Sequence, residues 1–256
     1  MSYAAMPPAG GKIDIIAEVQ TAFTTVWQNV RLALDLAWLP FAMLVVAEIV
    51  ALLLGGAGMF GMMLAALVRG LGFVVFGTIF IVRWHRFVLL GETATGDLFP
   101  LGWGPFFIAA IKITLGVIVG MVILMLIAAL PPHFLTGLVA AIGGIALAVG
   151  SSRLSLVFPA AAIERPIALR DAWDLAAGNF WRLFACLILC YLPFAILHFL
   201  LRGSGGASGA IGWLVFQVIG LAVSFAGVAV VASLLSSLYR QLSGQPGRAE
   251  LRQALG

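Results

Sequence analysis

The sequence predicts an all-α integral membrane protein: six transmembrane helices in three hairpins, with amphipathic helices on the cytoplasmic face. Three observations support this fold class. Hydrophobic residues make up 63% of the 256-residue chain and charged residues only 9%, whereas soluble domains carry about 25% charged residues. The apolar residues gather in six runs, each near the ~20 residues needed to cross about 30 Å of hydrocarbon. Lysine and arginine concentrate in alternate connections between these runs.

The N-terminal region precedes the first apolar run. Residues 1–12 are rich in proline and glycine, and we expect them to be disordered. Over residues 13–31, apolar side chains recur at helical spacing opposite a polar face. Such a helix either lies in the membrane interface or packs on partner helices, and Trp27 and Arg31 at its end favour the interface. Because no apolar h-region comes first, we expect no cleaved signal peptide.

Each of the six apolar runs is predicted to cross the membrane as one helix. Their connections alternate between short, nearly uncharged turns and longer loops that are charged and aromatic. A short turn makes the two helices it joins antiparallel neighbours, so we expect three hairpins in a single membrane domain, residues 13–240, followed by a cytoplasmic tail, 241–256. The predicted transmembrane helices are 33–54, 58–82, 105–130, 134–158, 182–201 and 211–238.

The cationic residues predict the orientation of the chain in the membrane. The short turns hold only Arg202. The terminal regions and longer loops hold Lys12, Arg31, Arg83, Arg86, Arg165, Arg170, Arg182, Arg240, Arg248 and Arg252. Because cytoplasmic loops carry an excess of lysine and arginine, we expect both termini and both longer loops to face the cytoplasm.

The loop after the fourth apolar run predicts a second interfacial helix, residues 166–177. Pro166 suits the first turn of a helix, and Gly178 suits the position just past its end. Apolar residues that include Trp173 would face lipid or the bundle, while Arg170 and its acidic neighbours would face the cytoplasm.

Charged residues inside apolar runs are the first candidates for function, because burying a charge in lipid is costly. Glu48 and Arg69 lie on adjacent antiparallel helices at depths that differ by roughly 6 Å, within reach of an arginine side chain. We expect them to pair, either as a structural link in the hairpin or as a substrate or ion site; Arg69 could instead extend to the lipid surface. Lys112 lies about two turns into the third run, where snorkelling to the interface is a sufficient explanation.

Arg153 is a further candidate, because mostly apolar residues follow it as far as Glu164. A helix broken at Pro159 would free backbone groups that need partners inside the protein. Arg153, with Ser151, Ser152 and Ser155, could supply those partners, or Arg153 could bind a lipid phosphate. The sequence leaves both alternatives open.

Arginine and aromatic residues also cluster at the predicted membrane edges. The run Arg83-Trp84-His85-Arg86 and the pair Trp181-Arg182 suit anchors at the level of the lipid headgroups, with a structural role as the alternative.

Catalytic and ligand-binding motifs are missing from the sequence. It has no serine-hydrolase elbow, no zinc-protease motif, no phosphate-binding glycine loop and no basic block of the nucleic-acid-binding kind. Cys186, Cys190 and His198 share one face of the fifth run, but no second cluster would complete a zinc site. We therefore expect no metal, no cofactor, no enzyme activity and no nucleic-acid partner.

A family resemblance rests on the stretch from Arg153-Leu-Ser-Leu-Val-Phe-Pro159 to Gly178-Asn-Phe-Trp-Arg182. It resembles a recurring pattern in bacterial six-helix membrane proteins of unassigned function. It is also similar to the membrane domain fused to some glycerophosphoryl diester phosphodiesterases. The resemblance implies a polytopic module of the bacterial inner membrane without known catalytic residues. The soluble phosphodiesterase domain is not expected in this chain, so its activity is not carried over.

Two functions from different classes follow from these observations. The first is a non-enzymatic membrane module that interacts with lipids, anionic lipids among them, or with partner proteins, including further copies of itself. The alternative is a small transporter or permease subunit that uses Glu48, Arg69, Lys112 and Arg153 inside the bundle. A water-filled cavity at Glu48 and Arg69 would favour the alternative, and a dry, tightly packed pair would argue against it.

Overall fold

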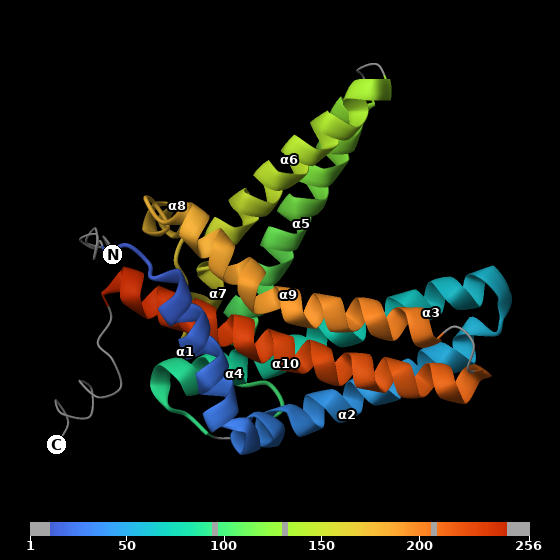
Figure 1. Ribbon diagram of the computed structural model, residues 1–256. Helices are drawn as coiled ribbons and strands as arrows, with labels where there is room; N and C mark the ends of the chain where they lie inside the picture. The colour runs from blue at the N-terminus through green and yellow to red at the C-terminus, as the bar shows by residue number, and fades with distance from the viewer. Residues whose placement is uncertain (1–10, 94–96, 130–132, 206–208, 245–256) are drawn as a thin grey trace.

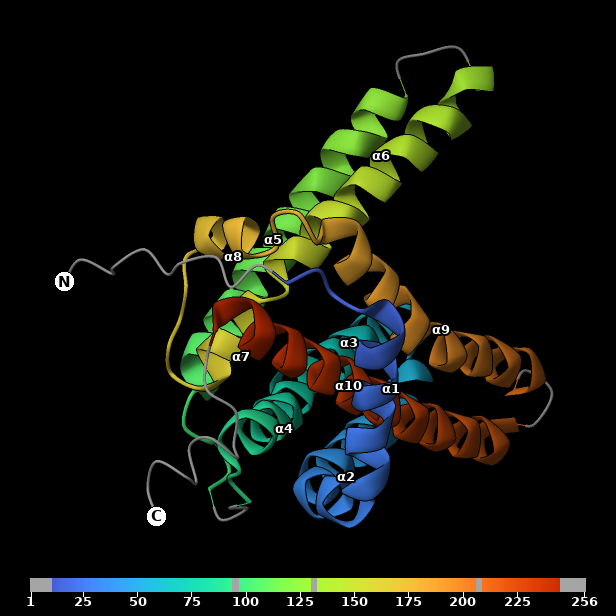
Figure 2. The same cartoon turned by 60° about the vertical axis from the view of Figure 1, so that its left-hand side comes forward.

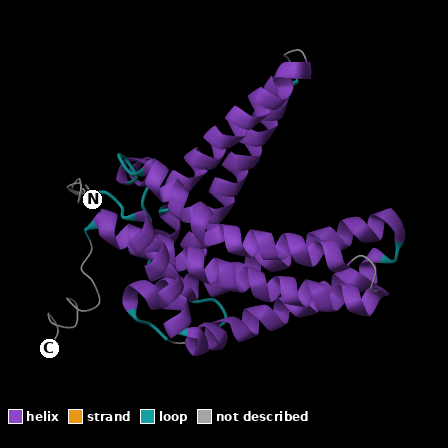
Figure 3. Cartoon of the chain, viewed as in Figure 1, coloured by secondary structure: helices purple, strands orange, loops and turns teal. Residues whose placement is uncertain are grey.

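A computed structural model describes residues 11–93, 97–129, 133–205 and 209–244, and all the regular structure in these ranges is helical (Figure 3). Six helical spans are long and apolar enough to cross a membrane, as predicted. The predicted disordered segment 1–12 and tail 241–256 lie largely outside the described residues. In chain order, the α-helices of these ranges are α1 (Ile15–Gln28), α2 (Val30–Gly55), α3 (Gly58–Gly72), α4 (Thr78–Leu90), α5 (Trp103–Ala128), α6 (His133–Leu154), α7 (Val157–Ala162), α8 (Leu169–Leu175), α9 (Phe180–Gly205) and α10 (Gly209–Ser243).

The helices meet at a junction formed by α1, α4, α7 and α10, in which α10 packs on the other three and α4 packs on α7. From this helix junction, α2, α3, α9 and α10 extend to one side, and the pair α5–α6 extends in a different direction (Figures 1 and 2). Consecutive helices α2 and α3, α5 and α6, and α9 and α10 are in contact. The junction holds most of the core, including Val82, Leu156, Leu234 and Leu238, all of which are fully buried.

The second span is longer than predicted. It runs from Gly58 to Leu90 as α3, a five-residue π-helical stretch η1 (Phe73–Gly77), and α4. The residues after position 82 stay helical because α4 is buried by its neighbours, so the arginines there are inside the protein and do not begin a loop. The helix ends at Gly91, whose φ of +79° is the left-handed conformation that glycine adopts readily.

The fourth span is broken, as the sequence suggested, but four residues before Pro159. α6 ends at Leu154, and α7 begins at Val157 after a short turn. A proline ring clashes with the carbonyl four residues earlier, here Ser155, which disfavours a continuous helix at this position. Within α7, Pro159 occupies the first turn, where its missing N–H costs no hydrogen bond.

The two helices predicted to be amphipathic both differ from expectation. α8 covers Leu169–Leu175 instead of 166–177, and the Asp171 carboxylate accepts a hydrogen bond from the Ala168 N–H at 3.2 Å at its start. α1 places its apolar face on α9 and α10. Phe23 stacks on Phe194 of α9 at 6.2 Å between ring centroids, and Ala22 is fully buried. The packing of α1 on partner helices, the less favoured alternative, therefore describes its contacts.

Candidate functional site

The Glu48–Arg69 contact is present between α2 and α3. Arg69 Nε donates to Glu48 Oε2 at 2.9 Å, and both side chains are partly exposed. The helices approach closely beside the pair because Gly72 faces Ala47; a Cβ on Gly72 would lie 3.3 Å from the Ala47 methyl. The Arg69 guanidinium also lies 5.0 Å from the ring centroid of Trp213 on α10. The pair thus links three helices.

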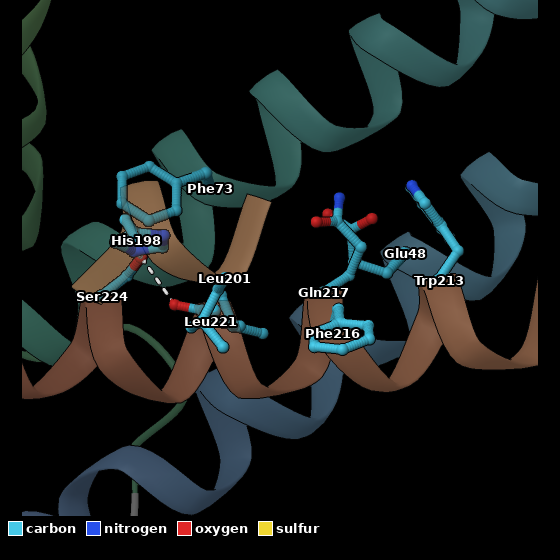
Figure 4. Close-up of a pocket in the computed structure, with 10 residues that line it drawn as sticks. Glu48, Phe73, His198, Leu201, Trp213, Phe216, Gln217, Leu221 and Ser224 are labelled. Carbon is cyan, nitrogen blue, oxygen red and sulfur yellow. Dashed lines mark hydrogen bonds between the residues drawn. The ribbon is translucent and has the colours of Figure 1, made fainter. Parts of the chain in front are cut away.

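A cavity of about 400 Å³ adjoins this pair, with walls from α2, η1, α9 and α10 (Figure 4). Its volume falls in the range of small-molecule sites, which are about 300–1,000 Å³. Aromatic rings and aliphatic side chains form part of its wall. Five polar or amphipathic side chains line the rest: Glu48, His198, Trp213, Gln217 and Ser224.

His198 and Ser224 form a hydrogen-bonded pair at one end of the cavity. His198 Nε2 lies 2.9 Å from Ser224 Oγ, and the Ser224 hydroxyl lies 3.1 Å from the Gly220 carbonyl. The Ser224 hydroxyl can donate to Gly220 or to His198 Nε2, and the tautomer of His198 decides which ring nitrogen carries the proton. Gly220 borders the imidazole, and a Cβ there would lie in van der Waals contact, 3.4 Å from His198 Cε1.

The π-helical stretch η1 brings Phe73 into the cavity wall. The Thr78 hydroxyl lies 2.6 Å from the Val74 carbonyl and 2.9 Å from that of Val75, so it supports carbonyls in the altered helical turn. Trp103 Nε1 in turn donates to the Thr78 hydroxyl at 3.0 Å. Single π-helical turns occur frequently at functional sites, so this irregularity is a second feature that marks the cavity.

Most of the cavity's polar lining was not anticipated from the sequence, although α10 carries a readable signal. Trp213, Gln217, Gly220 and Ser224 are spaced four, three and four residues apart, which puts them on one face of a helix. Lys112, in contrast, is exposed on α5 and does not line the cavity. His198 points to Ser224, whereas Cys186 and Cys190 are buried in the core.

The run from Arg83 to Arg86 is buried instead of anchored at a lipid surface. Trp84 Nε1 donates to Ser233 Oγ at 2.8 Å, and His85 Nδ1 lies 2.7 Å from Ser236 Oγ. Arg86 makes a bidentate contact with Glu92 at 2.6 and 2.8 Å and donates to the Ala162 carbonyl at 3.0 Å.

Arg83, the first residue of this run, is also buried. Its guanidinium donates to the backbone carbonyls of Leu36 and Asp97. The headgroup-anchor interpretation is therefore wrong for these four residues, because α4 runs through the core, and the structural alternative fits their contacts.

The remaining predicted residues lie where α6, α8 and α9 meet. Arg182 donates to the Ile13 carbonyl at 2.7 Å and so ties the N-terminal segment to α9, while Trp181 is exposed. The guanidinium of Arg153 lies between two aromatic rings, Trp173 of α8 and Phe180 of α9. None of Arg153, Trp181 and Arg182 lines the cavity described above.

Neither the grouping of possible metal ligands nor similarity to known proteins identifies this chain. Within the described ranges, no three histidine, cysteine or acidic side chains are grouped so that they could hold a metal ion. No family model, curated protein or solved structure matches this chain. The family resemblance drawn from the stretch 153–182 stays a prediction.

Proposed function

We propose that the chain is a multi-pass protein of a bacterial cytoplasmic membrane, with its N- and C-terminal regions in the cytoplasm. Six apolar helices of sufficient length support the membrane location. The beginning of α1, the loop 97–102, α8 and the end of α10 lie toward the same end of the molecule (Figure 1). Arg170 of α8 and Arg240 in the last turn of α10 belong to these segments, in keeping with the excess of cations that the positive-inside rule expects of a cytoplasmic face.

We further propose that the protein binds a small polar solute in the cavity beside Glu48, as a transporter or permease subunit would. One observation supports this function above all: a cavity of about 400 Å³ with a charged and hydrogen-bonding lining lies among helices that are otherwise apolar. Polar groups inside membrane-spanning helices usually mark a substrate or ion pathway. A purely structural ion pair requires no such space next to it.

The lining indicates the chemistry of the solute. The Glu48 charge is balanced by Arg69, so the site does not demand a net charge from its ligand. Gln217 offers both donors and an acceptor, the His198 imidazole offers a hydrogen-bonding ring nitrogen, and Phe73 and Phe216 offer apolar faces. These groups suit a neutral or zwitterionic molecule with several hydrogen-bonding atoms and a small apolar part.

A solute screen on the purified protein tests this proposal. Neutral, zwitterionic and charged solutes are added to wild type, Glu48→Gln and Asp35→Asn, and the change in thermal stability is measured. Asp35→Asn is the matched control, since Asp35 is exposed on the same helix α2 and does not line the cavity. We expect Glu48→Gln to weaken binding by about tenfold, the loss of one hydrogen bond to a charged group.

Two results would argue against the solute site. One is a panel in which no solute stabilises the wild type. The other is equal binding by the wild type and Glu48→Gln, which would leave the ion pair a purely structural role.

A second candidate function is the lipid- or partner-interacting module that the sequence favoured. It is supported by α5 and α6, whose apolar side chains are mostly left uncovered by the rest of the protein. Lipid, a partner protein or another copy of the chain would cover them in a membrane. A pull-down from mild detergent should recover a stable partner or enriched anionic lipid, and recovery of neither would contradict this function.

A further inference from the structure

Arg153 is a cation held between two aromatic rings near the predicted cytoplasmic surface. Its guanidinium carbon lies 4.0 Å from the ring centroid of Trp173 and 5.1 Å from that of Phe180. Its Nε atom is buried and has no hydrogen-bond partner in the described part of the chain. Elsewhere in the protein, Arg86 and Arg182 donate to carboxylates or backbone carbonyls, so Arg153 differs from both.

The broken helix beside Arg153 does not use its guanidinium. Ser151 donates to the Ala148 carbonyl at 3.0 Å, Ser152 to that of Val149 at 2.7 Å, and Ser155 to that of Ser152 at 2.6 Å. The serines therefore satisfy carbonyls at the end of α6 without help from the arginine. Of the two roles that the sequence left open for Arg153, the contacts do not support the internal one.

The acidic residues of α8 do not neutralise Arg153 either. Asp174 lies 4.0 Å from Arg170, and Asp171 accepts from the Ala168 N–H. Among the described residues, no carboxylate oxygen comes within 4.0 Å of Arg153. A partly buried cation without a counterion is unfavourable, so the position favours an anion supplied from outside the chain.

The start of α9 lies beside this cation. Phe180, whose ring packs on Arg153, is the first residue of α9, and the first N–H groups of a helix have no partner within it. The preceding Asn179 side chain does not cap them, because it accepts from the Ile13 N–H at 3.0 Å and donates to the Gly11 carbonyl at 3.2 Å. A helix N-terminus of this kind favours a negatively charged group.

We propose that Arg153 and the first turn of α9 bind a phosphate group, and that a phospholipid headgroup supplies it. A planar guanidinium matches two phosphate oxygens, and stacking between rings holds it in one orientation. Trp173 and Trp181 are 41% and 57% exposed, and indoles in this position are typical of the headgroup level of a membrane. This phosphate site is separate from the Glu48 cavity and does not depend on the solute-binding proposal.

Lipid titration of the purified full-length protein tests the site. Wild type, Arg153→Gln and Arg170→Gln are titrated in mixed micelles with phosphatidylglycerol, with a phosphate-free glycolipid, and separately with inorganic phosphate, and bound ligand is measured by native mass spectrometry. Arg170→Gln is the matched control, because it removes the same charge from an α8 side chain that is 91% exposed. We expect Arg153→Gln to weaken phosphatidylglycerol binding by about tenfold, Arg170→Gln by less than about twofold, and the glycolipid not to bind at this site.

The arms of the experiment separate the possible outcomes. Wild-type binding of inorganic phosphate with the same dependence on Arg153, but no binding of phosphatidylglycerol, would replace the lipid with a free phosphate and overturn the lipid source. Equal losses in both variants, or none in Arg153→Gln, would overturn the site itself. Arg153→Lys keeps the charge without the planar fork and provides a second variant if the glutamine variant does not fold; undiminished binding by Arg153→Lys would contradict recognition by the guanidinium.

Discussion

The helix junction and the α5–α6 pair contain similarly apolar helices, but they bury them very differently. In the apolar windows of the spans Gly58–Leu90 and Ile211–Ser243, 39% and 44% of residues are buried inside the protein, against 6% in each of the spans that contain α5 and α6. Polar side chains follow the same division: Trp84, His85 and Arg86 are buried and bonded, whereas Lys112 of α5 is exposed. Hydropathy therefore locates the helices that could cross a membrane but does not tell which of them form the protein core.

The largest expected effect comes from emptying the core of the junction. Trp84→Ala removes a fully buried indole, and we expect the free energy of unfolding to fall by about 3–5 kcal/mol. Leu126→Ala on α5, where the side chain is 65% exposed, should change it by less than about 0.5 kcal/mol. Equilibrium unfolding in mixed micelles measures both; similar losses would mean that α5 is packed as tightly as α4 in the membrane.

A smaller effect is expected from the buried arginine of the same run. Arg86→Gln breaks the bidentate contact with Glu92 and the hydrogen bond to Ala162, and should lower the free energy of unfolding by about 2 kcal/mol. The same unfolding assay applies, with Arg170→Gln as the exposed counterpart. If both arginine variants unfold like the wild type, the proposed difference between buried and surface arginines is wrong.

Ser233→Ala tests a single hydrogen bond in the junction. The change leaves the buried Trp84 Nε1–H without its acceptor, which should cost about 1–2 kcal/mol. Ser151→Ala, which removes an exposed hydroxyl bonded within its own helix, is the control. A shift in the Trp84 environment, measured by tryptophan fluorescence, should accompany only Ser233→Ala, and a stability change without that shift would point to a different cause.

The smallest effect distinguishes two glycines of α5. A Cβ on Gly116 meets nothing within 4 Å, so Gly116→Ala should stabilise the helix by up to about 1 kcal/mol through its greater helical propensity. A Cβ on Gly120 would lie 2.5 Å from Leu147 Cδ1 of α6, so Gly120→Ala should gain less, because Leu147 must move. Thermal unfolding of the two variants gives the ranking, and the reverse order would contradict the α5–α6 contact.

The sequence predicts the helical class and the six apolar spans well and the site only in part. Helix length and hydropathy are local properties, so the six spans could be located to within several residues. The Glu48–Arg69 contact followed from a tight turn and matching depth, which are also local. The partners of Trp84 and His85 could not be predicted, because Ser233 and Ser236 lie about 150 positions away in sequence and are brought together only by the packing of α4 on α10.

The cavity, too, could be predicted from the sequence only in part. The four positions Trp213, Gln217, Gly220 and Ser224 form a readable polar stripe on α10, but a stripe alone does not tell whether it faces a cavity or a neighbouring helix. Arg153 stands out in the sequence as a charge followed by mostly apolar residues. Its aromatic neighbours, from two different helices, could not be predicted from spacing.

The most direct test of the central claim asks whether the cavity beside Glu48 contains water in a membrane. Gln217→Cys, which lines the cavity, and Val215→Cys, which is 51% exposed on the outer surface of α10, are treated in liposomes with a hydrophilic thiol reagent. Cys186 and Cys190 are buried, so the wild type gives the background. Because the thiolate forms readily only in contact with water, the cavity predicts that Gln217→Cys reacts at least about tenfold faster than Val215→Cys. Equal rates, or no reaction at position 217, would contradict a water-filled binding site.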